Sequence, residues 1–330
     1  MTIAEILRAI SKLNVLVMGD ICLDRWCTYD PAADEPSRET GLPRIGVVRF
    51  KSTAGACGTI ANNLADLGVG RVAVMGAIGE DTHGDELFRA LNVRDIDVDL
   101  VLRSDLIQTF TYTKHINAET GQEDLPRVDF INQTALPEEL EAQLVRSFDS
   151  FSKHFDAILV CDQAETAKGG IVTSRLRAAI NRMAEMNEKK IVWVDSRKRA
   201  ELFQYCYLKP NEDEAREASV RLLGHEDYAL MLPALQLKAL VVTAGESGAD
   251  VIDTAGRTRH RTILVEHPVD ICGAGDSFSA GAASALAAGA SLQEAVQMGN
   301  LVASITIMKQ GTGTANPEEV LTASAAAGIA

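Results

Sequence analysis

The sequence predicts a protein of the α/β class, with a mostly parallel central sheet covered by helices on both faces. Short runs rich in Val, Ile and Leu have the length of buried strands, and in the second half of the chain they alternate with helical patterns. This alternation is typical of parallel strands joined by helical crossovers. Because ligands bind such sheets at the carboxyl ends of the strands, the loops that follow the strands are the informative ones.

Composition and hydropathy argue against binding to nucleic acids and to membranes. The chain has 330 residues, 46% hydrophobic and 24% charged, with a formal net charge of −14. This acidity disfavours nucleic-acid binding, although one nucleotide needs only a local positive field. No apolar run reaches the roughly 18 residues of a membrane span, and residues 1–14 lack the apolar core of a signal peptide. We therefore expect a cytoplasmic protein that binds neither nucleic acid nor membranes.

The first half of the chain combines strands and helices with a long polar excursion. Residues 22–51 are rich in turn formers and charges and close on a strand-like run. Residues 109–116 alternate with period two over their first half, and with residues 127–130 they predict a hairpin that pairs with the excursion. Around these segments we expect strands at residues 14–20, 71–76 and 96–100 and helices at residues 59–67 and 85–91.

From Pro137 onward the pattern becomes strand–helix repeats. Strands are expected at residues 157–160, 190–194, 207–209, 239–243 and 262–265, and helices at 174–187 and 211–222. The informative loops therefore follow Val17, Val160, Val194, Lys209, Thr243 and Val265. We expect the Ala-rich residues 322–327 to be frayed.

The most informative stretch is Asp-Ile-Cys-Gly-Ala-Gly-Asp-Ser-Phe at residues 270–278, between the strand-like run 262–265 and a helical run of small residues. Gly273 and Gly275 at a helix N-terminus let backbone N–H groups face an anion, and the helix dipole adds positive potential. Asp276 is a carboxylate where an anion should sit, which indicates a base beside a phosphoryl group. From this segment alone, an Asp that only caps the helix explains the pattern equally well.

Two acidic residues follow the first strand, and a glycine-containing turn precedes the first long helix. Asp20 and Asp24 could accept hydrogen bonds from a polyol, or could simply form a turn. Gly55 and Gly58 flank Cys57 at a helix start, as in a turn that binds an anion or a hydroxyl, or they supply loop flexibility.

Asn211 and Glu214 open the helix after Pro210. Asn at the N-cap with Glu three residues later is a capping-box pattern. The functional alternative is a pair that holds Mg²⁺ through water, because Mg²⁺ prefers oxygen ligands and keeps several waters.

Three later segments contain residues that could form a nucleotide site. Gly245 and Gly248 follow the strand that ends at Thr243, where they could admit phosphates or ribose, or form a hairpin turn. Asn300 on a late helix, with the loop from Gly311 to Gly313 and Thr314, would flank a base if the helix lies beside the glycine loop. Several other site signatures are absent: G-x-x-x-x-G-K-[ST], G-x-G-x-x-G after the first strand, H-E-x-x-H, G-x-S-x-G and C-x-x-C.

Together these motifs resemble the PfkB (ribokinase-like) family of carbohydrate kinases, collinearly from about residue 15 to residue 317. The most specific match is residues 270–278, supported by Asn-Glu-Asp-Glu at 211–214 and Thr-Ala-Gly-Glu-Ser-Gly at 243–248. The resemblance implies one ribokinase-like three-layer αβα domain over residues 1–330. It also implies a small β-sheet lid from about 22–51 and 108–131, which often forms a dimer contact.

The resemblance also implies residue roles in ATP-dependent phosphorylation of a sugar or sugar phosphate. Asp276 would take the proton from the sugar hydroxyl, and N–H groups of Gly273, Ala274 and Gly275 would hold the γ-phosphoryl group. The remaining roles are Mg²⁺ at Asn211 and Glu214, a monovalent cation such as K⁺ near Asp270, the sugar at Asp20, Asp24, Gly55, Thr59 and Arg127, and ATP at Thr243, Gly245, Gly248, Asn300, Gly311 and Gly313.

Within the family, the chain resembles the bacterial kinases of D-glycero-β-D-manno-heptose 7-phosphate. Residues 19–26 (Gly-Asp-Ile-Cys-Leu-Asp-Arg-Trp) resemble that group's G-D-x-x-L-D-R-Y, and residues 127–130 (Arg-Val-Asp-Phe) its R-L-D-F. The departures lie on the sugar and phosphate side: Gly55-Ala56 replaces Gly-Gly, Thr59 replaces an Asn, and Asp195-Ser196-Arg197-Lys198 replaces D-P-K-G. Another acceptor, such as a different sugar or a nucleoside, and a non-catalytic sensor remain as alternatives.

Overall fold

The computed structural model describes residues 1–33, 35–166 and 168–329 and confirms the predicted α/β class. The strands of the large sheet are β1 (Asn14–Gly19), β4 (Arg71–Gly79), β5 (Asp97–Ser104), β8 (Ala157–Asp162), β9 (Ile191–Ser196), β10 (Tyr207–Leu208), β11 (Ala239–Thr243), β12 (Ala249–Asp253) and β13 (Gly256–His260). Their order is β13-β12-β11-β10-β9-β8-β1-β4-β5. All neighbours between β11 and β5 in this order pair in parallel. At the other edge β12 and β13 pair antiparallel.

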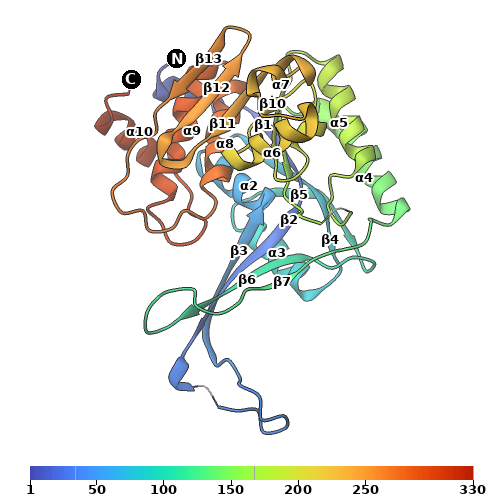
Figure 1. Ribbon diagram of the computed structural model, residues 1–330, viewed down its shortest axis with the longest axis vertical. Coiled ribbons are helices and arrows are strands. Elements are labelled where there is room, and N and C mark those ends of the chain that lie inside the picture. The colour runs from blue at the N-terminus through green and yellow to red at the C-terminus, as the bar shows by residue number, and fades with distance from the viewer. Residues whose placement is uncertain (34, 167, 330) are drawn as a thin grey trace.

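Helices cover both faces of this sheet (Figure 1). One face packs against α1 (Ile3–Ile10), α2 (Cys57–Asp66), α3 (Thr82–Asn92), α8 (Ala274–Ala287), α9 (Leu292–Thr306) and α10 (Pro317–Ala326). The other packs against α4 (Glu138–Phe151), α5 (Ser174–Met186), α6 (Glu212–Leu223) and α7 (Tyr228–Ala234). Successive residues of β1 alternate between the two cores, Val15 and Val17 in one and Leu16 and Met18 in the other, as strand geometry requires.

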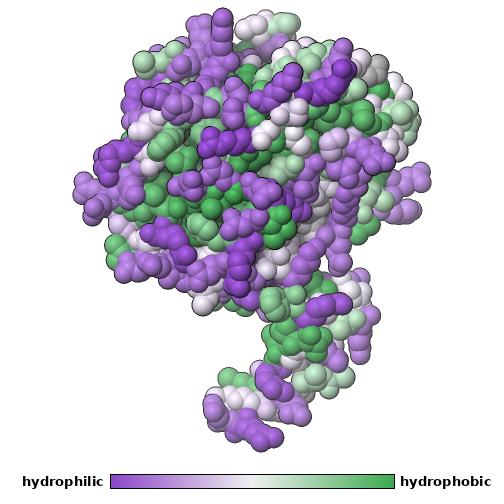
Figure 2. Space-filling view, turned by 180° about the vertical axis from the view of Figure 1, so that it is seen from behind, coloured by the Kyte–Doolittle hydropathy of each residue, from purple (hydrophilic) through white to green (hydrophobic). Residues whose placement is uncertain are grey.

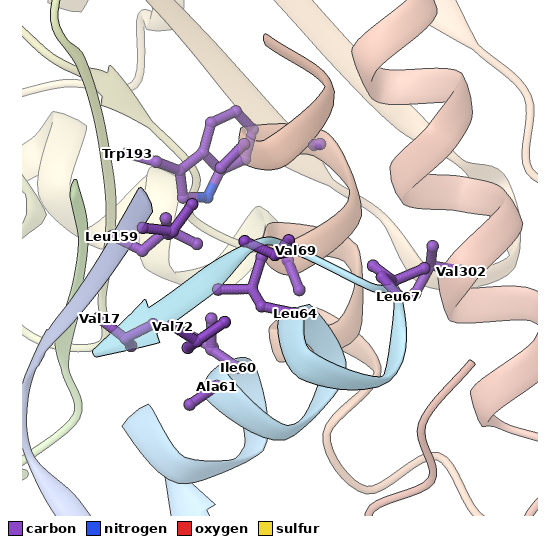
Figure 3. Close-up of a cluster of buried hydrophobic side chains, with 14 of the residues drawn as sticks. Val17, Ile60, Ala61, Leu64, Leu67, Val69, Val72, Leu159, Trp193 and Val302 are labelled. Carbon is purple, nitrogen blue, oxygen red and sulfur yellow. The ribbon is translucent and has the colours of Figure 1, made fainter. Parts of the chain in front are cut away.

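The core beneath α2 and α8 fixes the glycine loop in space. Figure 3 shows Ile60 and Leu64 of α2 packed over the sheet, near Val17 and Leu159. Trp193 of β9 is fully buried, and its ring lies 6.3 Å from that of Phe278 on α8. Tight packing of such large side chains leaves α8 little freedom, so its first turn is held at the edge of the sheet.

A second, four-stranded sheet projects from the body (Figure 1). Its strands are β2 (Ile21–Tyr29), β3 (Val47–Ala56), β6 (Phe110–Asn117) and β7 (Val128–Phe130), in the order β3-β2-β6-β7. The predicted hairpin and its pairing with the excursion are confirmed, although the excursion opens with a strand and not with turns. Residue 34 of the excursion lies outside the described residues. That this sheet acts as a lid stays a prediction.

Two predictions about the C-terminal third are wrong. Residues 262–265 form no strand; the edge strand β13 lies just before them, and the Leu264 side chain is 81% exposed. Residues 322–327 are not frayed, because most of them belong to α10, which begins with an Asn316–Glu319 capping box and buries Val320. Within the described ranges, we find no helix with the length and apolar character needed to cross a bilayer.

Candidate active site

Two cavities meet at the N-terminus of α8. The first has a volume of about 160 Å³ and lies between the small sheet and the body. The second, of about 330 Å³, is mainly apolar and lies between α8, α9 and the loops after β11 and β13. Gly273 and Asp276 line the first cavity, and Ala274 and Gly275 line the second. The first turn of α8 therefore separates two ligand-sized spaces.

The glycine loop leaves N–H groups exposed at that turn. Gly273 is the N-cap of α8 with φ +76°, a left-handed conformation that favours glycine. The Ala274 N–H donates to the Ile271 carbonyl at 3.2 Å, so it is not available to an anion, contrary to expectation. Among the described residues, the N–H groups of Gly273, Gly275 and Asp276 have no acceptor. An anion hole built here would use these three groups.

The Asp276 carboxylate does not cap α8, so the capping alternative is wrong. No donor among the residues that the structure describes bonds to it. Burial and the neighbouring Asp195 carboxylate raise the pKa of Asp276 to about 8, partly offset by the Lys209 ammonium group. A carboxyl group with a pKa near the working pH is suited to general-base chemistry.

The small sheet brings one predicted sugar ligand, Asp24, to the first cavity. Burial raises the pKa of the Asp24 carboxyl to about 6. Gly55 lies on β3 opposite Cys22, and a Cβ atom added to it would come within 2.3 Å of Asp24 Oδ2. The sequence pattern therefore needs glycine there because Asp24 occupies the space.

Asp20 and Thr59 do not line either cavity. The Asp20 carboxylate is buried and accepts hydrogen bonds from the N–H groups of Gln163, Ala164 and Ile171 at 2.7–2.8 Å. It thus fixes the loop after β8. Thr59 is 1% exposed, with its methyl group beneath Gly273. Both residues support the site without reaching its interior.

Basic side chains surround the first cavity, and the sequence identified only one of them, Arg127, as a site residue. Lys114 lies on β6, Arg197 directly after β9, and Arg127 stacks on the ring of Tyr112 at 5.2 Å. Each cation has a partly exposed carboxylate partner outside the cavity: Glu123, Glu165 and Asp129 respectively. Such exposed pairs are weak, so the cations can exchange partners with a bound anion.

Arg25 also borders the first cavity, but strand alternation turns its side chain toward the other face of the small sheet. In the β2–β6 register Asp24 faces Tyr112 and Trp26 faces Lys114, which puts these four side chains on the cavity side. The Arg25 guanidinium group lies toward α3, where its Nη1 approaches His83 Nε2 at 3.4 Å. Lys198, another basic residue near the site in sequence, pairs with Glu217 and does not line the cavity.

The Asn211–Glu214 capping box is confirmed, and it leaves room for a metal. Asn211 Oδ1 accepts from the Glu214 N–H at 2.9 Å, and Glu214 Oε2 accepts from the Asn211 N–H at 2.8 Å. Glu214 Oε1 has no hydrogen-bond partner within the described chain, and burial raises the pKa of this carboxyl. The structure described here contains no group of three or more acidic, His or Cys side chains able to hold a metal. A free carboxylate oxygen suits Mg²⁺ held mainly by water and phosphates.

The predicted nucleotide residues divide between the second cavity and its surroundings. Thr243, Gly245, Gly248 and Asn300 line the cavity. Gly311 and Gly313 do not: Gly311 packs on Trp26, and the Gly313 carbonyl accepts from Asn63.

Asp270 ties the loop at residue 311 to the glycine loop. Its Oδ1 accepts from the Cys272 N–H at 2.9 Å and its Oδ2 from the Gly311 N–H at 3.1 Å. Asp270 thus links the two segments that border the first turn of α8.

A model of the "pfkB family carbohydrate kinase" matches residues 14–319. The chain belongs to this family. It is therefore an ATP-dependent carbohydrate kinase. Curated relatives include the "Bifunctional protein HldE" of Hyphomonas neptunium and of a Caulobacter strain, each 32% identical over 97% of this chain. The chain spans 65% and 64% of the length of these two relatives.

Solved structures agree on the kinase fold. A ribokinase from Thermotoga maritima has a TM-score of 0.71 at 23% identity and covers 94% of this chain and 99% of its own. Phosphofructokinase-2 from Escherichia coli, in complex with potassium, has a TM-score of 0.70 at 19% identity over 95% and 99% of the two chains. At these identities the likeness establishes the ribokinase-like fold alone.

Proposed function

We propose that this pfkB-family kinase transfers the γ-phosphoryl group of ATP to a hydroxyl of a sugar phosphate, with Asp276 as the general base. The observation that carries the proposal is the position of Asp276, without a hydrogen-bond partner in the described chain, between the two cavities. ATP would occupy the apolar cavity and the acceptor the cavity beside Asp24. The N–H groups of Gly273, Gly275 and Asp276 would face the transferring group.

In this mechanism the protein supplies positioning and charge. Asp276 takes the hydroxyl proton as the acceptor oxygen bonds to the γ-phosphorus and the bond to ADP breaks. The helix dipole and the free N–H groups stabilise the charge that spreads over the phosphoryl oxygens. Bound Mg²⁺, approached by Glu214 and Asn211 through water, would neutralise phosphate charge.

We propose D-glycero-β-D-manno-heptose 7-phosphate as the acceptor, phosphorylated at position 1. Two observations support a phosphorylated acceptor of this kind: the resemblance of residues 19–26 and 127–130 to kinases of that sugar, and the cations Lys114, Arg127 and Arg197 around the cavity. Three cations suit a phosphate dianion better than a neutral sugar or a nucleoside.

Charge-removing variants test the phosphorylated acceptor. Lys114→Met and Arg197→Met should each raise the KM for heptose 7-phosphate by about tenfold, the effect of losing one charge-assisted contact. The KM for ATP should stay unchanged. Lys198→Met is the matched control, since Lys198 follows Arg197 in the chain but pairs with Glu217 and does not line the cavity. Unchanged acceptor KM in both cavity variants would refute the phosphate assignment and favour another sugar or a nucleoside.

A non-catalytic sensor is the remaining alternative, and its support is limited to the substituted residues Ala56 and Thr59. The geometry of Asp276 and Glu214 weighs against it. Asp276→Asn should lower kcat by about 10²- to 10⁴-fold, the usual cost of losing a general base, while ATP binding persists. Asp149→Asn, on the exposed surface of α4, is the matched control. Turnover near the wild-type rate in Asp276→Asn would contradict the base role.

Two further features, the cellular compartment and a monovalent cation, belong to the same proposal. We place the reaction in the cytoplasm, where ATP is available. A K⁺ ion near Asp270 is supported by the potassium complex of the phosphofructokinase-2 neighbour. A K⁺ site predicts faster turnover in potassium chloride than in tetramethylammonium chloride of equal ionic strength.

A homodimer through the small sheet is supported by its apolar outer face. Figure 2 shows hydrophobic residues gathered on the projecting sheet. Val48 and Phe50 lie on the side opposite Lys51 and the cavity and are 60% and 61% exposed. Val128 adds a further exposed apolar side chain. An apolar patch on a projecting sheet is typical of an interface.

A further inference from the structure

A buried ion pair lies outside both cavities and is not used by the mechanism above. Lys209 follows β10, and its Nζ lies 2.8 Å from Oδ2 of Asp195 on β9. The two residues are only 3% and 5% exposed. The backbone continues the strand pairing here, because the Lys209 N–H donates to the Val194 carbonyl at 2.8 Å.

The pair lies directly under the first turn of α8. A Cβ atom at Gly275 would be 3.5 Å from Lys209 Nζ, which is the nearest atom to that position. From the same helix, Ser279 Oγ donates to Asp195 Oδ2 at 3.5 Å, and Gln163 Nε2 donates to Asp195 Oδ1 at 3.3 Å. Two donors, Ser279 and Gln163, thus hold Asp195 while it holds the Lys209 ammonium group beside the glycine loop.

Stability alone does not account for this arrangement. Removing two charges from water costs several kcal/mol per ion, and apolar side chains of similar volume often stabilise a fold as well or better. The position of the positive charge does have an electrostatic consequence, because the free N–H groups of Gly275 and Asp276 lie in the turn above it. A charge fixed in a site of low dielectric constant acts strongly on neighbouring anions.

We infer that Lys209 is a positioning residue for phosphoryl transfer, and that Asp195 holds its ammonium group beneath α8 so that the turn remains positive for the anions gathered there. The inference rests on the proposed role of Asp276 as the base. Lys209 acts through the field and the turn, since it lines neither cavity.

Several ionisable groups face Asp276. The Asp195 and Asp24 carboxylates raise its pKa, whereas Lys209 and Arg197 lower it. Thiols also lie near it, those of Cys22, Cys57, Cys161 and Cys272. Loss of the Lys209 charge alone should therefore raise the pKa of Asp276 and leave less of the base ionised at neutral pH.

The test is the pH profile of kcat for Lys209→Met with MgATP and the acceptor. We expect the acid limb to move up by about one pH unit, the lower range for an opposite charge nearby. That shift means about a tenfold lower kcat at pH 7 and recovery toward alkaline pH. Arg199→Met is the matched control, since Arg199 forms a separate ion pair, with the buried Asp162, at 2.6 Å. Its acid limb should stay in place.

A Lys209→Met variant with a lower Tm but an unshifted acid limb would overturn the inference. If that variant does not fold, Lys209→Gln replaces it, because the amide keeps a polar group in the buried position without the charge. The same upward shift of the acid limb is expected for Lys209→Gln, and an unshifted limb in that variant would overturn the inference. Asp276→Asn separates the two proposals. If this variant keeps its turnover, the role of Asp276 as the base is refuted. If it loses turnover while the pH profile of Lys209→Met is unshifted, only the role of Lys209 is refuted.

Discussion

Gly55→Ala is the smallest change that should separate acceptor binding from nucleotide binding. The added methyl group would lie 2.3 Å from Asp24 Oδ2, 2.5 Å from Asp24 Cγ and 2.6 Å from Cys22 Sγ. Contacts this short force Asp24 out of its position in the cavity. Overpacking of this kind costs about 1–3 kcal/mol. If that cost falls on the acceptor complex, kcat/KM for the acceptor drops by about 5-fold to 150-fold.

The assay is initial-rate kinetics with the acceptor varied at saturating ATP, and then with ATP varied. The KM for ATP should change little, because the second cavity lies beyond the first turn of α8. Ser52→Ala is the matched control: it lies on the same strand but on the opposite face, where it bonds to Glu86 of α3. A folded Gly55→Ala enzyme with wild-type kcat/KM for the acceptor would refute the assignment of Asp24 to the sugar site.

Three other predictions concern stability, metal and assembly. The raised pKa of Asp276 means that the folded state favours the protonated carboxyl, so the stability of the protein falls as pH rises from about 4 to about 8. Asp276→Asn should therefore raise the Tm by about 2 °C or more at pH 8 and leave it unchanged near pH 3.5. Equal Tm values of the two proteins at pH 8 would contradict the burial argument. Glu214→Gln should raise the Mg²⁺ concentration for half-maximal rate by about 10-fold, and an unchanged requirement would remove Glu214 from the metal site. Phe50→Glu should convert the dimer into a monomer in sedimentation at micromolar concentration, whereas a monomeric wild type would contradict the interface.

Features that depend on local sequence could be predicted, because the relevant residues are neighbours along the chain. The start of α8 at the glycine loop follows from Gly273 and the small residues after it. The capping box at Asn211 and Glu214 needs only a spacing of three residues. Buried parallel strands such as β8 and β9 are similarly visible as short apolar runs.

Features that depend on packing could not be predicted from the sequence. An acidic residue after β1 has the position of a ligand, yet the Asp20 carboxylate accepts hydrogen bonds from three N–H groups of a loop 143–151 positions away in the chain. An apolar run at residues 262–265 looks like a strand, yet β13 already forms the edge of the sheet. The Lys209–Asp195 pair exists only because β9 and β10 are adjacent. The position of Lys114 at the cavity follows from the register of β2 with β6, which alternation within one strand does not give.

The measurement that tests the central claim most directly is an ADP-release assay with MgATP against a panel of acceptors. The panel contains heptose 7-phosphate, fructose, fructose 6-phosphate, ribose, adenosine and inosine, each tested with wild type and with Asp276→Asn. Strong turnover on heptose 7-phosphate, lost in Asp276→Asn, is the result that we predict. Equal turnover by the two proteins, or no ADP from any acceptor while ATP still binds, would contradict the account.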